Sequence, residues 1–69
     1  MEIIKTKDEY IKLDSFLKLA NIAQTSGESK LIIQDGLVKV NGETELRRGK
    51  KLRPGDEVEI DGNKFIIGE

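Results

Sequence analysis

The most evident chemistry in this chain lies in one short basic run. Five of the seven residues from Arg47 to Arg53 are cationic and none is acidic, although the 69-residue chain carries a formal net charge of −1. Positive charge concentrated on a small protein is the electrostatic footprint of a surface that holds phosphates. A solvated loop that serves only solubility is the alternative. What surrounds the run in the fold decides between the two.

Catalysis and metal binding find little support in the composition. The chain contains no His and no Cys, so it lacks the usual general base near neutral pH and every soft metal ligand. Thr25, Ser26 and Ser29 have no evident base, and their spacing suits helix capping. Glu57 and Glu59 share one face of a predicted strand, which suits a solvated sheet better than an acid–base pair. We therefore expect no enzyme activity, no cofactor and no metal site.

Two short helices are expected to carry part of the positive charge. Apolar side chains recur at i, i+3, i+4 and i+7 over residues 13–20, which predicts a first helix with one apolar face. Residues 25–28 have the spacing of a capping box, which predicts a second helix that starts after Thr25 and whose body runs over 29–34. Gly36 is placed to end that helix in a left-handed conformation. The pair predicts a helical hairpin.

The remainder of the chain alternates with the period of β-strands. Residues 38–40 and 57–60 alternate apolar and polar side chains, and residues 64–67 form the returning strand of the second hairpin. Asn41-Gly42 and Asp61-Gly62 have the composition of tight hairpin turns. The sequence therefore predicts an α+β fold, with two short helices packed on a small, bent, mostly antiparallel sheet.

Length and hydropathy predict the number of domains and the location of the protein. Residues 1–69 suffice for a single domain with a small core. Ile3 and Ile4 indicate a short edge strand at the N-terminus. No segment is apolar enough for a signal peptide or a membrane span, so we expect a cytoplasmic protein.

Further cations fall on the predicted helices and on the strand before the first hairpin turn. If the helices pack through their apolar faces, several of these amines are expected to surround one shallow surface, with the basic run at its rim. The cations concerned are Lys12, Lys18, Lys30, Lys39, Arg47, Arg48, Lys50 and Lys51.

The few aromatic residues narrow the class of nucleic acid. Tyr10, Phe16 and Phe65 are the only aromatics, and the patterns assign Phe16 and Phe65 to the core. Recognition of single strands usually depends on exposed aromatic platforms, of which this chain offers at most Tyr10. A structured RNA held by its phosphates is therefore the expected partner. Arginines suit bidentate phosphate contacts, and lysines act as mobile point charges.

Four segments of the chain together form a recognisable pattern, namely Lys12-Leu13-Asp14-Ser15-Phe16-Leu17, Thr25-Ser26-Gly27-Glu28-Ser29-Lys30, Ile33-Gln34-Asp35-Gly36-Leu37-Val38-Lys39-Val40-Asn41-Gly42 and Pro54-Gly55-Asp56. In this order they resemble one known family, the S4 RNA-binding domain, which is named for a protein of the small ribosomal subunit. The resemblance covers about residues 12–60. The segment 47–52 looks like that of short, stand-alone bacterial members.

The resemblance implies RNA binding through the two helices and the following hairpin. The implied partner is structured RNA, in particular ribosomal RNA or a ribosomal subunit, with no membrane and no small-molecule substrate. The positions that the resemblance makes RNA-facing are Lys12, Ser26, Lys30, Lys39 and Asn41, and Lys18, which we also assign to the RNA-binding site, stands where the family often has a basic residue. Lys12 stands where Arg is common, Gly27 where a basic residue is common and Ser29 where Ala is usual. These departures shift weight onto Arg47, Arg48, Lys50 and Lys51.

An interaction module for other proteins is the alternative function. In that case the acidic C-terminal strands, or a sheet edge at Ile66-Ile67, would dock a partner protein. The isoelectric point near 5.5 favours this alternative. RNA binding requires instead that the acidic residues lie on the face opposite the cations, beyond a Debye length of about 8 Å.

Overall fold

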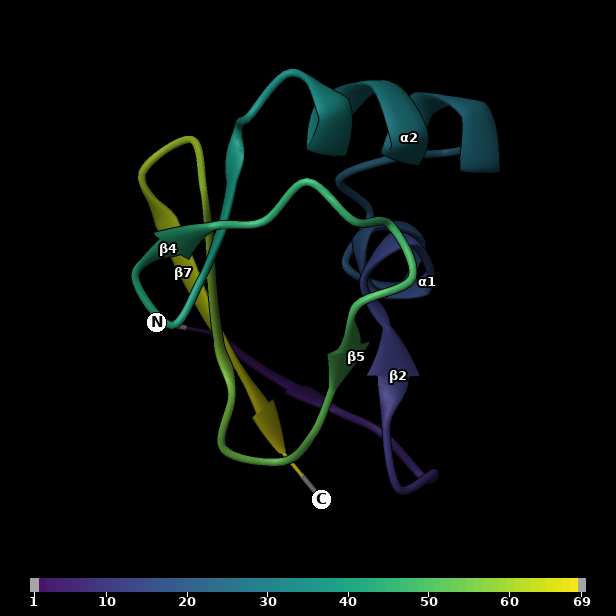
Figure 1. Cartoon of the computed structure of the whole chain (residues 1–69). Coiled ribbons are helices and arrows are strands. Elements are labelled where there is room, and N and C mark those ends of the chain that lie inside the picture. The colour runs from purple at the N-terminus through teal and green to yellow at the C-terminus, as the bar shows by residue number, and fades with distance from the viewer. Residues whose placement is uncertain (1, 69) are drawn as a thin grey trace.

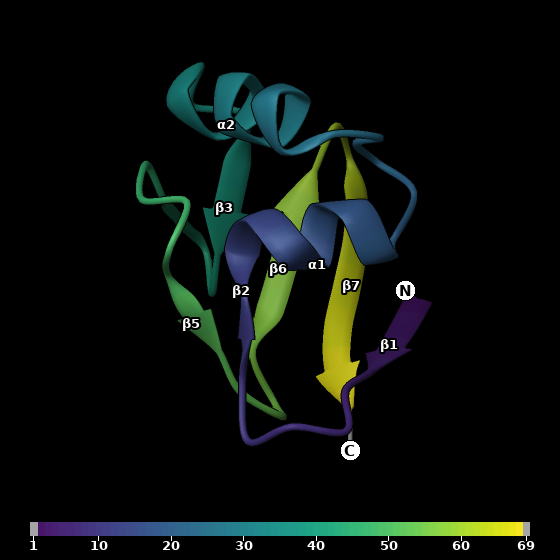
Figure 2. The same ribbon diagram turned by 90° about the vertical axis from the view of Figure 1, so that its right-hand side faces the viewer.

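The structure is a computed structural model that describes residues 2–68. It is an α+β fold in which both helices cover one side of a twisted sheet (Figures 1 and 2). The elements in chain order are β1 (Glu2–Lys5), β2 (Ile11–Lys12), α1 (Leu13–Leu19), α2 (Ser26–Gln34), β3 (Val38–Val40), β4 (Glu43–Thr44), β5 (Lys51–Leu52), β6 (Glu57–Ile60) and β7 (Asn63–Gly68).

Helix α1 forms where the apolar period predicts it. Leu13, Phe16 and Leu17 are fully buried, and Asp14 lies in the first turn, where a carboxylate favours the helix dipole. The Phe16 ring meets the Phe65 ring of β7 edge-to-face, with 5.7 Å between centroids. This contact joins the helix layer to the sheet, and it confirms that both phenylalanines belong to the core.

Helix α2 begins at Ser26, directly after Thr25, and ends at Gln34, as the capping box and the predicted body over 29–34 indicate. Thr25 caps it as expected, because the Thr25 hydroxyl accepts a hydrogen bond from the Glu28 N–H at 3.1 Å. The Ser29 N–H already bonds the Thr25 carbonyl, so helical pairing begins directly after the cap. Gly36 takes the left-handed conformation expected after the helix, with φ of 77°.

The main sheet has the strand order β1-β7-β6-β3-β4. Three of its four pairings are antiparallel. The fourth is parallel and joins β1, which lies at one edge of the sheet, to β7. The expected α+β architecture and the edge strand at Ile3 and Ile4 are therefore confirmed. Ile66 and Ile67 do not lie at an edge, because β7 is paired on both sides.

Both predicted hairpin turns are present. Asn41 and Gly42 have φ of 52° and 86°, and Asp61 and Gly62 have φ of 52° and 79°. Two consecutive positive φ values in a two-residue loop match the right-handed twist of the flanking strands. Asn, Asp and Gly tolerate this conformation at little cost, which is why these dipeptides occupy the turns.

A second, two-stranded sheet pairs β2 with β5, and the sequence patterns do not predict this pairing. Ile11 lies opposite Leu52, which is fully buried, and both side chains pack on the core. This pairing holds the segment before α1 against the C-terminal part of the basic run.

Candidate nucleic-acid interface

Residues 45–50, which contain most of the basic run, are fixed to the beginning of α1. The Leu13 N–H donates to the Lys50 carbonyl at 2.9 Å, and the Asp14 N–H donates to the Arg48 carbonyl at 3.1 Å. Lys12, the N-cap residue, makes no side-chain cap, so these carbonyls satisfy N–H groups that a helix start leaves open. Figure 1 shows the chain after β4 crossing to the helix side before it returns through β5. The basic loop is therefore held beside α1 by backbone contacts, while its side chains remain available.

Arg48, Lys50 and Lys51 are arranged differently from Arg47. Arg48 and Lys51 are exposed and Lys50 is half-buried. Arg47 instead faces Glu45, with Nε to Oε2 at 3.1 Å and Nη2 to Oε1 at 3.4 Å. The Arg47 backbone N–H also donates to Glu45 Oε2 at 3.2 Å.

This ion pair changes the charge that the loop presents. The hydrogen bond from Arg47 holds the pKa of Glu45 below its usual range, and the same contact raises the pKa of Arg47. The Arg47 side chain remains 76% exposed, whereas that of Glu45 is 14% exposed. Arg47 therefore keeps donors directed to solvent, although Glu45 offsets its positive charge at short range.

Lys18, Ser26 and Lys30 form a second polar group on the joint face of the two helices. The Lys18 ammonium donates to the Ser26 hydroxyl at 3.2 Å, from α1 to the first residue of α2. Lys30 follows Ser26 by four residues, so the two side chains are neighbours on the same side of α2. Lys18 and Lys30 are both exposed.

A buried serine fixes the spacing of the helices that carry this group. Ser29 is fully buried, and its hydroxyl donates to the Asp14 carbonyl of α1 at 3.2 Å. The sequence alone marked Ser29 only as a small departure from Ala. In the fold, its hydroxyl adds a direct bond between α1 and α2, which positions Lys18 and Lys30 relative to each other.

Lys39 does not join the cations of the helices, which corrects the expectation of a common surface. Val38 and Val40 are buried, and alternation along β3 turns Lys39 to the helix-free face of the sheet. Lys39 there lies opposite Glu59, and Glu59 lies opposite Lys64. Two amines therefore flank one carboxylate on that face.

The side chain of Asn41, which was predicted to face RNA, makes two hydrogen bonds within the protein. Its side-chain oxygen accepts from the Glu57 N–H at 2.9 Å, and its side-chain nitrogen donates to Asp56 Oδ1 at 3.2 Å. Asp56 Oδ2 also accepts from the Arg53 N–H at 2.8 Å. The Asn41 side chain thereby ties the β3–β4 turn to the turn before β6.

Two residues near the basic loop were absent from the predicted site. Tyr10 lies beneath the Lys51 ammonium, which is 4.9 Å from the centre of its ring. Arg53 directly follows β5 and is exposed. Tyr10-Ile11-Lys12 and Lys51-Leu52-Arg53 each place one apolar residue between two polar or cationic ones. This period of two is the signal that would have revealed both residues.

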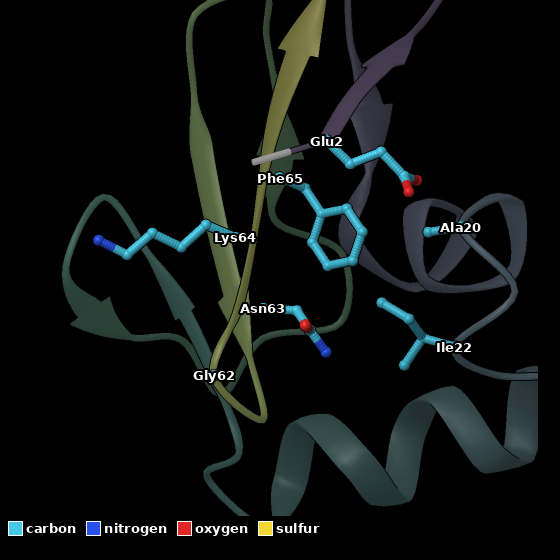
Figure 3. A pocket seen from close by; sticks show the side chains of 7 residues that line it. All are labelled: Glu2, Ala20, Ile22, Gly62, Asn63, Lys64 and Phe65. Carbon is cyan, nitrogen blue, oxygen red and sulfur yellow. The ribbon is translucent and has the colours of Figure 1, made fainter.

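One hollow of the surface lies away from these cations. It has a volume of about 970 Å³ and is lined by Glu2, Ala20, Ile22, Gly62, Asn63, Lys64 and Phe65. Figure 3 shows Phe65 and Ile22 turned into the hollow, whereas the Lys64 side chain points to the other side of β7. Mixed charges and an apolar floor distinguish this hollow from the basic group around α1.

Over residues 2–68, no helix is both long and apolar enough to cross a membrane. In the same part of the chain, no three acidic side chains gather as a metal-ion site.

A comparison with protein families matches residues 4–68 to the model described as the S4 domain. The chain belongs to the S4 domain family. The match includes β1 and β7 and is therefore wider than residues 12–60, over which the sequence resemblance was recognised. The S4 domain of this chain thus comprises both helices, the two-stranded sheet and almost all of the main sheet.

Relatives of this S4 domain include proteins connected with ribosomes and RNA. A curated protein named "Probable ribosome maturation protein RlbA", from Bacillus subtilis (strain 168), is 46% identical over 59 residues, covering 86% of this chain and 83% of that protein. The solution structure of YbcJ from E. coli, described as revealing an alfaL motif involved in RNA binding, has a TM-score of 0.74 at 27% identity. It covers 100% of this chain and 89% of YbcJ.

A larger ribosomal protein contains a similar unit. The crystal structure of the 30S ribosomal protein S4e from Thermoplasma acidophilum has a TM-score of 0.62 at 29% identity, covering 84% of this chain and 31% of that protein. The likeness at this level therefore concerns one part of a longer protein.

Proposed function

We infer that this S4 domain is a non-catalytic RNA-binding protein that acts on ribosomal RNA or on a ribosomal particle. The observation that carries the inference is the gathering of cations from separate segments around the two helices. Lys18 and Lys30 lie on the joint helix face, while Arg48 and Lys50 belong to the loop fixed at the start of α1. We also propose that residues 1–69 act as one RNA-binding domain.

The placement of two acidic residues of β6 supports this function despite the net charge of −1, whereas Asp14, Glu28 and Glu45 belong to the helices and the basic loop. Val58 and Ile60 are buried under the helices, so Glu57 and Glu59 face the opposite side of the sheet. The thinnest extent of the molecule is 18 Å, which exceeds a Debye length of about 8 Å. The carboxylates of β6 are therefore screened from phosphates bound at the helices.

The mechanism proposed is attraction to the RNA backbone, with the fold fixing where each charge lies. Arg48 offers a planar guanidinium for bidentate phosphate contact, and Lys50 adds a compact ammonium from the same loop. Lys12, Lys18 and Lys30 extend the positive surface along the helices. Because such contacts neutralise phosphates without reading base edges, binding depends on RNA shape more than on sequence.

Docking of a protein through the C-terminal strands has weaker support. Ile66 and Ile67 belong to β7, which has neighbours on both sides and offers no free edge there. The helix-free face carries Lys64 within 3.7 Å of Glu57, so its carboxylates are interspersed with amines. That face therefore lacks the acidic character that this alternative requires.

Replacement of Arg47, Arg48, Lys50 and Lys51 together with Gln tests the proposed function. Affinity for purified ribosomal RNA should fall, while circular dichroism and thermal unfolding stay close to those of the unmodified protein. If three to five phosphates are neutralised, log affinity should fall against log salt with a slope of roughly −2 to −4. Affinity that does not change with salt, or that survives the fourfold replacement, would contradict the mechanism.

A charge-matched pair of variants controls for net charge. Arg48→Gln with Lys50→Gln removes two cations from the loop, and Lys5→Gln with Lys64→Gln removes two from the helix-free face. Only the loop variant should lose affinity and flatten the salt slope by roughly 1 to 2. Equal losses would mean that net charge, not the helix-side surface, governs binding. If only the loop variant loses affinity, crosslinking in cells followed by sequencing would identify the bound RNA.

A further inference from the structure

The solvent side of the β2–β5 ribbon combines an aromatic ring with several cations. Ile11 and Leu52 face the core, so strand alternation turns Tyr10, Lys12 and Lys51 to the other side. The 4.9 Å distance from the Lys51 ammonium to the Tyr10 ring confirms that these two share that side. Arg53 follows Leu52 and precedes Pro54, and a residue before proline favours an extended backbone, which directs Arg53 to the same side.

The pairing of Lys12 with Lys51 breaks a local rule of sheet stability. The two lysines are direct cross-strand partners, and like charges in that arrangement are destabilising. Among residues 2–68, the ion pairs within 4.0 Å are Arg47 with Glu45 and Lys64 with Glu57, so neither Lys12 nor Lys51 has a direct acidic partner. Local rules are most often broken at functional sites, and a bound anion would relieve this repulsion.

We propose that this side of the ribbon, formed by Tyr10, Lys12, Lys51 and Arg53, binds one unpaired nucleotide of a folded RNA. The proposal rests on the RNA-binding function inferred above. The base stacks on the Tyr10 ring, and the adjoining phosphates lie between Lys12, Lys51 and Arg53. A stem held by the helices and the loop thus places its bulged or terminal nucleotide on the ribbon.

The relative strengths of two contacts favour this exchange. An exposed contact between an ammonium and an aromatic ring changes an equilibrium by only about two- to fivefold. Stacking of a nucleic-acid base on an aromatic side chain changes affinity by about 5- to 150-fold. The base therefore displaces the Lys51 ammonium from the ring, and the freed ammonium becomes available to a phosphate.

The composition of the chain supplies a specific probe of this site. Tyr10 is the only tyrosine and tryptophan is absent, so intrinsic fluorescence reports on Tyr10 alone. Three RNA hairpins serve as ligands at low salt: one with a single unpaired adenosine in its stem, one fully paired, and one with an abasic site in place of that adenosine. The adenosine hairpin should quench the fluorescence and bind at least about fivefold more tightly than the abasic hairpin.

Variants at Tyr10 separate stacking from packing. Tyr10→Phe keeps the ring and should keep the preference for the unpaired adenosine, whereas Tyr10→Leu keeps apolar bulk and should lose it. Circular dichroism checks that each variant is folded. Equal binding of the adenosine and abasic hairpins by the unmodified protein, or an unchanged preference in Tyr10→Leu, would overturn the proposal. Failure of all three hairpins to bind at low salt would instead count against RNA binding itself.

Discussion

Replacement of Asn41 separates a role in the fold from a role in RNA contact. The Asn41 side chain bonds the Glu57 N–H at 2.9 Å and Asp56 at 3.2 Å, while its backbone holds a left-handed φ of 52°. Asn41→Ala removes both side-chain hydrogen bonds. It also places an alanine in the left-handed conformation, which alanine disfavours because it has no polar side chain to stabilise it. Asn41→Gly removes the same bonds and relieves the backbone, so the pair divides the two effects.

The expected loss follows from these contacts. Each side-chain hydrogen bond contributes roughly 0.5–1.5 kcal/mol, and Asn41 is exposed, so the lower half of that range applies. A left-handed alanine adds roughly 1 kcal/mol. Asn41→Ala should therefore destabilise the fold by about 2 kcal/mol, and Asn41→Gly by about 1 kcal/mol. For a domain of this size, about 2 kcal/mol lowers the melting temperature by roughly 10 °C.

Urea unfolding and RNA binding measured on the same samples test this reasoning. Both variants should unfold at lower urea with an unchanged slope, and their folded fractions should bind RNA nearly as tightly as the unmodified protein. If Asn41→Ala keeps full stability and loses RNA affinity, Asn41 contacts RNA directly and the structural account is wrong. A larger loss of stability in Asn41→Gly than in Asn41→Ala would refute the part assigned to the backbone.

The remaining predictions concern the loop and the joint between the helices. Glu45→Gln should release Arg47, raise the affinity for RNA and steepen the salt slope of binding by roughly 1. Glu43→Gln makes the same change of charge on exposed β4 and should have a weaker effect. Equal effects of the two variants would exclude a role for the ion pair. Because Arg47 lowers the pKa of Glu45, the ion pair stabilises the fold fully at neutral pH and is lost as pH falls through the lowered value. Urea unfolding of the unmodified protein and Glu45→Gln should therefore converge in acid, and a constant difference would contradict this. Ser29→Ala should lower the free energy of unfolding by at most about 1 kcal/mol, because one hydrogen bond to Asp14 is lost. Ser29→Val should lower it by about 1–3 kcal/mol, because Ser29 is fully buried and a larger side chain must displace its neighbours. A smaller loss in Ser29→Val than in Ser29→Ala would disprove tight packing at this site.

Local patterns in the sequence were sufficient for most of the secondary structure. The 3.6-residue period of α1, the Thr25 cap and the Asn41-Gly42 turn all depend on residues close together in the chain, and each is confirmed. The start of α2 directly after Thr25 is confirmed as well, because the capping box acts within the first turn of the helix. The predicted position of the Ile66-Ile67 edge was wrong, since the order of strands depends on partners far away in sequence.

The candidate site divides in the same way. Composition and spacing identified the basic run, Lys18 and Lys30, because charge type is read directly from the sequence. They did not reveal that Glu45 holds Arg47, or that Asn41 is occupied by Asp56, because those contacts form only when strands and loops meet. The RNA-facing role of each predicted residue stays a prediction until the variants above are measured.

The sequence by itself determined the two helices, the strands β3, β6 and β7 with their hairpin turns, and the basic character of the loop. Hydrophobic period, capping and turn chemistry act within a few residues, so they can be read along the chain. Only the tertiary structure decided which charges share a surface. Pairing of β2 with β5 places Tyr10 beside Lys51, and the buried valines of β3 turn Lys39 away from the helices. The alternation of side chains along these strands is local, but the choice of strand partner and of the face that the helices cover depends on segments far apart in the sequence.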